Sequence, residues 1–206
     1  MAANEELFNA IGKGNRKLVI EIVQGVIDDK GNVADLLNET MIPAMRDVGD
    51  KFSRNEIYVP EMLIAARAMQ AGLDLIEPLL ADSGHEPRAR VAIGTVKGDL
   101  HDIGKNLVAM MLKGAGFEVD DVGVDCSVEK YEEAVERGST ILCLSALLTT
   151  TMPYMKTVAE HFQGRDDVKI VIGGAPVTED YANEIGAAGY GTDANDAVNA
   201  VESILA

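Results

Sequence analysis

The segment from Gly98 to Gly104 combines the residue types that can bind a metal. Asp99, His101 and Gly104 form an Asp-x-His-x-x-Gly motif between a short apolar run and an amphipathic run. This order predicts a strand, a turn and a helix, and ligands of open α/β sheets bind at such turns. A carboxylate on the second imidazole nitrogen is typical of histidines that ligate metals. The alternatives are that the histidine is simply solvated or acts as a general base, and that the acids are in the first helical turn because the helix dipole favours them there.

Composition narrows the classes of protein that fit. The chain has 206 residues, 47% of them apolar, which suits one medium domain or two small ones. Two cysteines without a Cys-x-x-Cys pair argue against a thiolate metal site. A net charge of −16 argues against nucleic acid as a partner. We expect no membrane span and no signal peptide, and therefore a cytoplasmic protein.

The first 81 residues predict helices only. Asn4 and Asn15 are placed to cap two short helices, and apolar residues recur every three or four positions over 33–52. Pro43 predicts a kink in that third helix, and Pro60 suits the first turn of a fourth. Four helices with short connections predict an antiparallel bundle.

A polar stretch over 82–88 predicts a linker, after which strands and helices alternate. The expected strands are 89–95, 117–122, 140–145, 168–173 and 189–191. The expected helices are 104–115, 128–137, 152–163, 178–187 and 194–205. This predicts an α/β fold with a five-stranded parallel sheet of flavodoxin-like (Rossmann-type) order 2-1-3-4-5.

Two further loops reach the carboxyl edge of that sheet. The loop after the third strand holds Ser145 and a row of threonines, and the loop after the fourth holds Gly173 and Gly174. Hydroxyls can donate and accept hydrogen bonds, and glycines permit a close approach to the backbone. Taken singly, these features also fit helix caps and a tight turn. Their convergence with the histidine loop favours a ligand site.

Together these motifs resemble the cobalamin-binding module of B12-dependent methyltransferases. The matching signature is Asp99-x-His101-x-x-Gly104, Ser145-x-Leu147 and Gly173-Gly174. The run 95–108 is similar to that module in methionine synthase, and 48–52 with 59–63 is similar to the helical cap before it. The resemblance is strongest to free-standing corrinoid proteins, and it implies a cap domain over 1–88 and a cobalamin-binding domain over 89–206.

The resemblance implies roles for the matching residues. His101 would replace the cofactor's own base as the lower cobalt ligand, the base-off/His-on state, and Asp99 would hold its other nitrogen. Thr151 stands where relatives often have a serine that bonds this aspartate. Phe52 and Val59 would cover the methyl-bearing face, although relatives often have leucine at the second position. The other implied cofactor contacts are Val96, Gly98, Asp102, Ile103, Gly104, Ser145, Leu147, Thr149, Gly173, Gly174 and Ala175.

The implied activity is that of a methyl carrier, not catalytic alone, which shuttles between Co(I) and methyl-Co(III). We expect two separate methyltransferases as partners, one for the methyl donor and one for tetrahydrofolate or a thiol coenzyme, and a reductive activator. The cap must move aside for transfer, which predicts a hinge near 82–88.

Three alternatives remain at this stage. A B12-dependent sensor needs an output domain, and we expect no DNA-binding segment here. The cobalamin subunit of a radical isomerase does not fit a cap of this type. A cofactor-free response module leaves Gly173-Gly174 unexplained.

Overall fold

The structure is a computed structural model that describes residues 4–82 and 87–206. Contacts divide the chain into two compact units, residues 1–88 with 110–116, and residues 89–109 with 117–206. Most of the predicted linker, residues 83–86, lies outside the described residues. The predicted domain limits, 1–88 and 89–206, stay a prediction.

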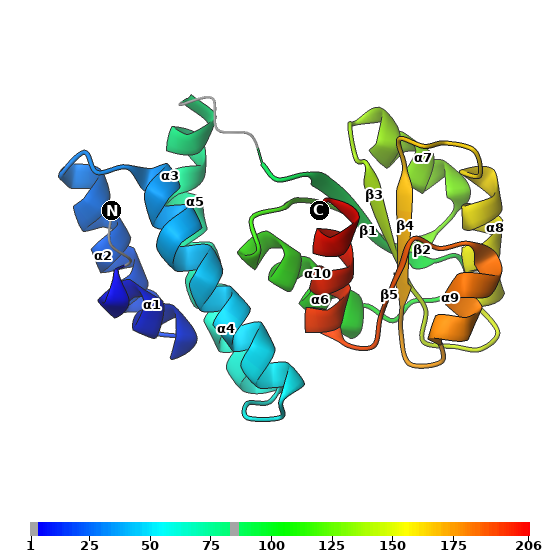
Figure 1. The fold of residues 1–206 in the computed structure, drawn as a ribbon, viewed down its shortest axis with the longest axis horizontal. Coiled ribbons are helices and arrows are strands. Elements are labelled where there is room, and N and C mark those ends of the chain that lie inside the picture. Colours follow the sequence, from blue (N-terminus) through cyan, green and yellow to red (C-terminus); the bar gives the residue numbers. More distant parts are fainter. Residues whose placement is uncertain (1–3, 83–86) are drawn as a thin grey trace. The chain divides into compact units, whose positions relative to one another are not determined.

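The first unit is built mainly from helices, as predicted (Figure 1). The Asn4 and Asn15 side chains accept hydrogen bonds from the backbone amides of Leu7 and Leu18 and so cap the first two helices. Its helices are α1 (Glu5–Gly12), α2 (Arg16–Asp28), α3 (Val33–Leu36), η1 (Leu37–Met41), α4 (Ile42–Ser53) and α5 (Val59–Asp82).

The expected third helix is continuous but changes type ahead of Pro43. Proline cannot donate to the carbonyl four residues earlier, and its ring crowds that carbonyl. The chain forms the π-helical turn η1 at this point, and the Ile42 amide donates to the Leu37 carbonyl oxygen instead. The ordinary α-helix resumes as α4, with Pro43 in its first turn.

Helix α5 buries the apolar face that the sequence predicts. All members of that face are buried, namely Met62, Ala65, Ala66, Met69, Leu73, Ile76 and Leu80. Within residues 4–82 and 87–206, no helix combines the length and the apolar character that a membrane crossing needs.

The second unit holds a parallel five-stranded sheet in the predicted order, β2-β1-β3-β4-β5. Its strands are β1 (Arg90–Val96), β2 (Glu118–Cys126), β3 (Ile141–Ser145), β4 (Lys169–Gly173) and β5 (Gly189–Gly191). Its helices are α7 (Val128–Glu136), α8 (Pro153–His161), α9 (Glu179–Ile185) and α10 (Ala194–Ile204). Helix α6 (Ile103–Gly114) begins in this unit, whereas its residues 110–114 belong to the first.

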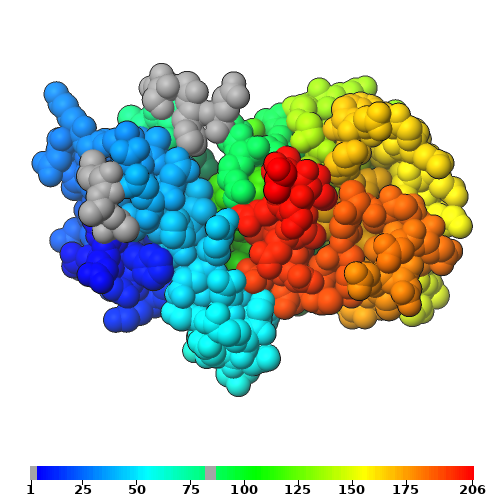
Figure 2. All heavy atoms as spheres, viewed as in Figure 1, coloured from blue at the N-terminus to red at the C-terminus, as the bar shows by residue number. Residues whose placement is uncertain are grey.

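Helices cover both faces of this sheet. One core joins the sheet to α7, α8 and α9, with Tyr131, Met155 and Val158 against Leu142 and Leu144. Helix α10 lies on the opposite face (Figure 1). The atoms of α9 and α10, orange to red, form part of the unit's surface in Figure 2. Because the central strands are buried on both faces, they read as continuous apolar runs.

Strand register brings the candidate loops to one edge. Thr95 is the register partner of Ser145, Ser145 is that of Gly173, and Gly173 is that of Gly191. The loops after β1, β3 and β4 therefore start from adjacent points of the carboxyl edge, as the flavodoxin-like order predicts.

Strand β2 ends four residues later than predicted. It runs to Cys126, and its pairing with β1 shifts register twice, between Ile93 and Gly94 and between Gly94 and Val96. Each shift inserts one residue into β2, which defines a β-bulge. Acidic residues and glycine are typical of loops, so the sequence pattern predicts an end of the strand that is too early.

Both cysteines are buried, as expected for structural thiols. Burial raises the pKa of Cys143 to about 12 and also raises the pKa of Cys126. Neither is available as a thiolate ligand in the folded protein.

Candidate functional site

The loop between β1 and α6 carries the Asp-x-His motif at the carboxyl edge of the sheet. The buried Thr95 hydroxyl donates to the His101 carbonyl oxygen at 2.8 Å, and the Asp99 amide donates to the Val96 carbonyl oxygen at 3.1 Å. Gly98 has a φ of +85°, a conformation that favours glycine. The loop thus has a defined backbone that presents both side chains of the motif.

The Asp99 carboxylate is fully buried and joins two loops. Among the described residues, five donors reach it. On Oδ1 they are the His101 backbone amide at 3.1 Å and ring Nδ1 at 2.7 Å. On Oδ2 they are the amides of Leu147 and Leu148, at 2.8 and 3.3 Å, and the Thr151 hydroxyl at 2.7 Å. The β3–α8 loop is therefore linked to the histidine loop through one carboxylate.

These donors determine the charge of Asp99. Burial alone is the largest influence and raises its pKa, but the Leu147 amide, the His101 ring and the Thr151 hydroxyl together outweigh it. The pKa of Asp99 lies well below its usual range, so the carboxylate is ionised at neutral pH. An ionised carboxylate only accepts, so Nδ1 of His101 must carry the proton in this contact.

The His101 ring is fixed at one nitrogen, and its side chain is 51% exposed. With the proton on Nδ1, the lone pair of the neutral ring lies on Nε2, which leaves Nε2 as the atom that could ligate a metal. Across the described part of the chain, no group of three His, Cys, Asp or Glu side chains is placed to hold a metal ion. A single imidazole fits a metal that arrives with its other ligands already in place.

The surroundings of the ring fit a large ligand with apolar parts. Leu100 and Ile103 flank the histidine in the chain and are 72% and 79% exposed. Leu147 and Leu148, whose amides bind Asp99, are also exposed. A Cβ added at Gly104 would meet no atom within 4 Å, so the start of α6 is open. A lone metal ligand beside exposed apolar side chains suits a metal macrocycle such as cobalamin.

Gly174 is required by the fold itself. Its φ is +127°, and an added Cβ would lie 1.9 Å from the Ala146 carbonyl oxygen. At Gly173 the same test places the Cβ 3.0 Å from the Gly191 carbonyl oxygen. Gly174 therefore permits close packing of the loops after β3 and β4, and Gly173 permits close packing against β5, in addition to any role toward a ligand.

The remaining predicted contacts lie in several environments. Val96 is buried in the sheet, Ser145 is half-buried at the end of β3, and Asp102, Thr149 and Ala175 are exposed in loops. Phe52 and Val59 belong to the first unit, where they lie on either side of the α4–α5 connection. Their assignment to the methyl-bearing face stays a prediction.

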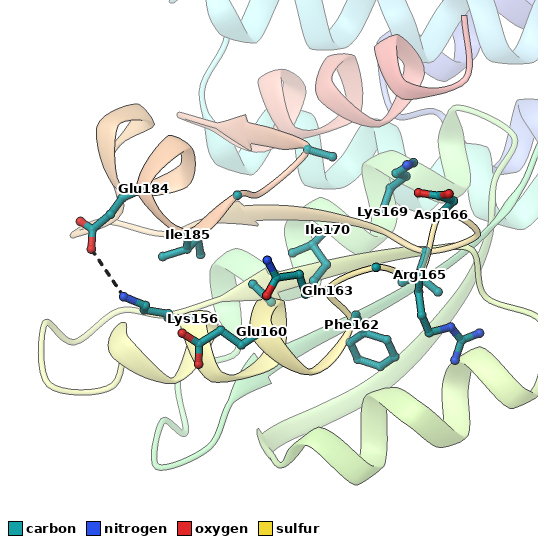
Figure 3. A pocket seen from close by; sticks show the side chains of 15 residues that line it. Lys156, Glu160, Phe162, Gln163, Arg165, Asp166, Lys169, Ile170, Glu184 and Ile185 are labelled. Atoms are coloured by element: carbon teal, nitrogen blue, oxygen red, sulfur yellow. Dashed lines mark ion pairs between the residues drawn. The ribbon is translucent and has the colours of Figure 1, made fainter.

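A hollow of about 400 Å³ lies at the amino ends of β4 and β5, away from this edge. Its lining mixes acidic and basic side chains from α8, α9 and the 163–168 loop (Figure 3). Lys156 and Glu184 form an ion pair of 3.9 Å across it. The hollow is distinct from the Asp99–His101 loop.

Known proteins match both units. Two B12-binding domain families match, one over residues 89–199 and one over residues 3–77. A corrinoid protein of Desulfitobacterium hafniense (strain Y51) is 36% identical, and the alignment covers 100% of this chain and 98% of that protein. The chain belongs to the B12-binding corrinoid proteins of methyltransferase systems.

Other relatives of this corrinoid protein support the same family. The trimethylamine corrinoid protein of Methanosarcina barkeri is 38% identical, with 100% of this chain and 99% of that protein aligned. The solved methanol:cobalamin methyltransferase complex of Methanosarcina barkeri contains a chain with a TM-score of 0.84 and 28% identity. The match covers 97% of this chain and 78% of that chain. The fold, a Rossmann-like sheet preceded by helices, is therefore shared.

Sequence reasoning missed three side chains that support the histidine loop. They are Thr95, which binds the His101 carbonyl, Lys105, which is buried at the start of α6, and Asp125, which binds the Gly98 amide at 2.7 Å. The sequence contains signals for two of them, because Lys105 directly follows the motif and Asp125 is an acid just after the predicted second strand. The groups that these three side chains bind are backbone atoms or residues of β2, and no pattern in the sequence identifies such partners.

Proposed function

We propose that this corrinoid protein binds cobalamin base-off, with Nε2 of His101 as the lower cobalt ligand, and carries methyl groups between two methyltransferases. The observation that supports this most directly is the 2.7 Å contact between the buried Asp99 carboxylate and Nδ1 of His101. It leaves Nε2 as the free ligating atom of a half-exposed ring. The membership of the corrinoid family supplies the cofactor class.

When bound, cobalamin would supply the methyl-transfer chemistry, for which its cobalt would alternate between the Co(I) and methyl-Co(III) states. The chain's own contribution is the control of the lower ligand. Asp99 orients the ring through Nδ1, so Nε2 keeps its position whether or not it binds cobalt. Thr151 and the 147–148 amides keep Asp99 ionised in both cases. The Asp99–His101 pair thereby holds the ligating nitrogen in place.

The partners follow from the carrier role. One methyltransferase loads the methyl group, a second delivers it to tetrahydrofolate or a thiol coenzyme, and a reductive activator restores Co(I) after oxidation. Trimethylamine and methanol are the first donors to test, because similar proteins carry those names. We also propose that the protein acts in the cytoplasm.

The helical unit is proposed to shield the methyl-bearing face, with Phe52 and Val59 as the shielding side chains. A shielded methyl group cannot reach another enzyme, so the helices must move aside during transfer.

The methyl-transfer test uses the full chain reconstituted with cobalamin and reduced to Co(I). A methyltransferase for trimethylamine or methanol is added with its donor, and the methylated cofactor is followed by its absorption spectrum. A donor-dependent spectral change that is reversed by an acceptor methyltransferase supports the carrier role. A protein that binds cobalamin but is not methylated by any enzyme and donor in a panel of methylamines, methanol, betaines and methoxylated aromatics contradicts it.

A separate prediction concerns His101 as the lower cobalt ligand. In the Co(II) state, the paramagnetic resonance spectrum should show hyperfine coupling to an imidazole nitrogen, and His101→Ala should remove it. His161→Ala is the matched control, because His161 is a half-exposed histidine of the same unit paired with Glu132. An unchanged spectrum in His101→Ala excludes His101 as the ligand.

A further inference from the structure

The bulged end of β2 lies beside the histidine loop. The two register shifts with β1 occur over residues 121–126, and Gly123 and Asp125 both have positive φ, +91° and +50°. Bulges bend a strand and redirect its side chains, and they are common next to functional sites. A positive φ is uncommon for a residue other than glycine, although aspartate tolerates it better than most.

Asp125 connects this bulge to the histidine loop through two hydrogen bonds. Its carboxylate accepts from the Gly98 amide at 2.7 Å. Its own amide donates to the Asp99 carbonyl oxygen at 3.0 Å. The two bonds therefore reach backbone groups of Gly98 and Asp99, which precede His101 by three and two residues.

A second contact holds the far end of the same segment. Nζ of Lys105, which is buried in the first turn of α6, donates to Asp121 Oδ1 at 2.6 Å. The same oxygen accepts from the Gly123 amide at 2.9 Å. The segment 98–105 is therefore attached to the bulge of β2 at both ends, while its Asp99 side chain is held from the β3–α8 loop.

We propose that Asp125 is a positioning residue for the cobalt ligand, acting through the backbone of Gly98 and Asp99. Its contacts hold the histidine loop in the ligating geometry before cofactor binds and while His101 is off the metal. The inference rests on the proposed function, because it assumes that His101 ligates cobalt. It assigns no contact with cobalamin to Asp125 itself.

Two substitutions separate the hydrogen bond from the backbone conformation. Asp125→Gly permits the positive φ but removes the acceptor, whereas Asp125→Asn keeps an acceptor oxygen and tolerates the same φ. Asp120→Asn is the matched control, because Asp120 is another acid of β2 and pairs with Arg137, at 2.7 Å, instead of the loop.

The first readout needs no cofactor. In the apoprotein, exchange of the Gly98 amide hydrogen should become about three- to tenfold faster in Asp125→Gly, since that amide loses its acceptor. Asp125→Asn and Asp120→Asn should stay within about twofold of the parent protein. Equal exchange in Asp125→Gly and the parent would overturn the proposal.

The second readout is ligation in the cobalamin-loaded protein. At a fixed pH, Asp125→Gly should show a smaller fraction of nitrogen-coupled Co(II) than the parent, and Asp125→Asn should restore it. If the parent itself shows no coupling that depends on His101, the proposed ligation fails. If the parent shows it and Asp125→Gly keeps the full fraction, only the positioning role fails.

Discussion

At the scale of residues, the centre of the site is the Asp99 carboxylate. It is buried, ionised and acceptor-only, and its donors come from the histidine loop and from the β3–α8 loop. A buried charge is tolerated only when hydrogen bonds compensate for its lost hydration. The same bonds that keep Asp99 charged also fix the ring that it orients. Stability and the orientation of the His101 ring therefore depend on a shared set of contacts.

Thr151 tests this shared dependence. Thr151→Val keeps the shape of the side chain but removes the hydroxyl that lies 2.7 Å from Asp99 Oδ2. Leaving a buried carboxylate one donor short should lower the free energy of unfolding of the apoprotein by about 1 to 3 kcal/mol. Thr151→Ser keeps the hydroxyl and should cost less. Urea denaturation of the three apoproteins measures the difference, and equal stability of Thr151→Val and the parent would show that the hydroxyl is dispensable.

The sequence predicts these residues unevenly, for a physical reason. The Asp99–His101 pair and the Thr151 hydroxyl are side chains in a recognisable pattern, and the structure brings them together. Thr95 and Asp125 act on backbone groups of the loop, which any residue supplies. Contacts of that kind become visible only when the register of β1 and β2 is known.

At the scale of elements, strand order and helix positions follow from the sequence, whereas irregular segments do not. Buried apolar runs and capping residues determine the regular elements, and these agree within a few residues. The π-helical turn before Pro43 and the bulged end of β2 are departures from regular hydrogen bonding. Periodicity describes regular pairing, so it cannot predict where pairing changes type.

Gly174, in the loop after β4, and Gly104, in the first turn of α6, give a matched prediction at this scale. Gly174→Ala should lower the stability of the apoprotein by about 3 kcal/mol or more, because the new Cβ meets the Ala146 carbonyl at a φ that alanine avoids. Gly104→Ala should leave apoprotein stability unchanged or raise it by up to about 1 kcal/mol, since its surroundings are open and alanine favours a helix.

Cobalamin affinity is the second measurement on the same pair. If Gly104 is a cofactor contact, as the resemblance implies, Gly104→Ala should bind cobalamin more weakly than the parent although it folds at least as well. Unchanged affinity in Gly104→Ala would remove Gly104 from the set of cofactor contacts. A stable Gly174→Ala protein would contradict the packing role of Gly174.

At the scale of the whole molecule, the chain has two compact units with different architectures and a net charge of −16. A strongly acidic surface disfavours polyanions, which agrees with a carrier that serves enzymes and not nucleic acid. The histidine loop belongs to the second unit, whereas Phe52 and Val59 belong to the first.

Cofactor binding should stabilise both units if Phe52 and Val59 shield the methyl-bearing face. A ligand that binds only the folded state adds about 2.7 kcal/mol at a hundredfold excess over its Kd. Hydrogen exchange followed separately over residues 4–82 and 117–206 should then slow in both ranges when methylcobalamin is added. In the double variant Phe52→Ala/Val59→Ala, the slowing should persist over 117–206 and diminish over 4–82, because only the helical contacts with the cofactor are lost. If 4–82 exchanges at the same rate with and without methylcobalamin in the parent, the helical unit does not hold the cofactor.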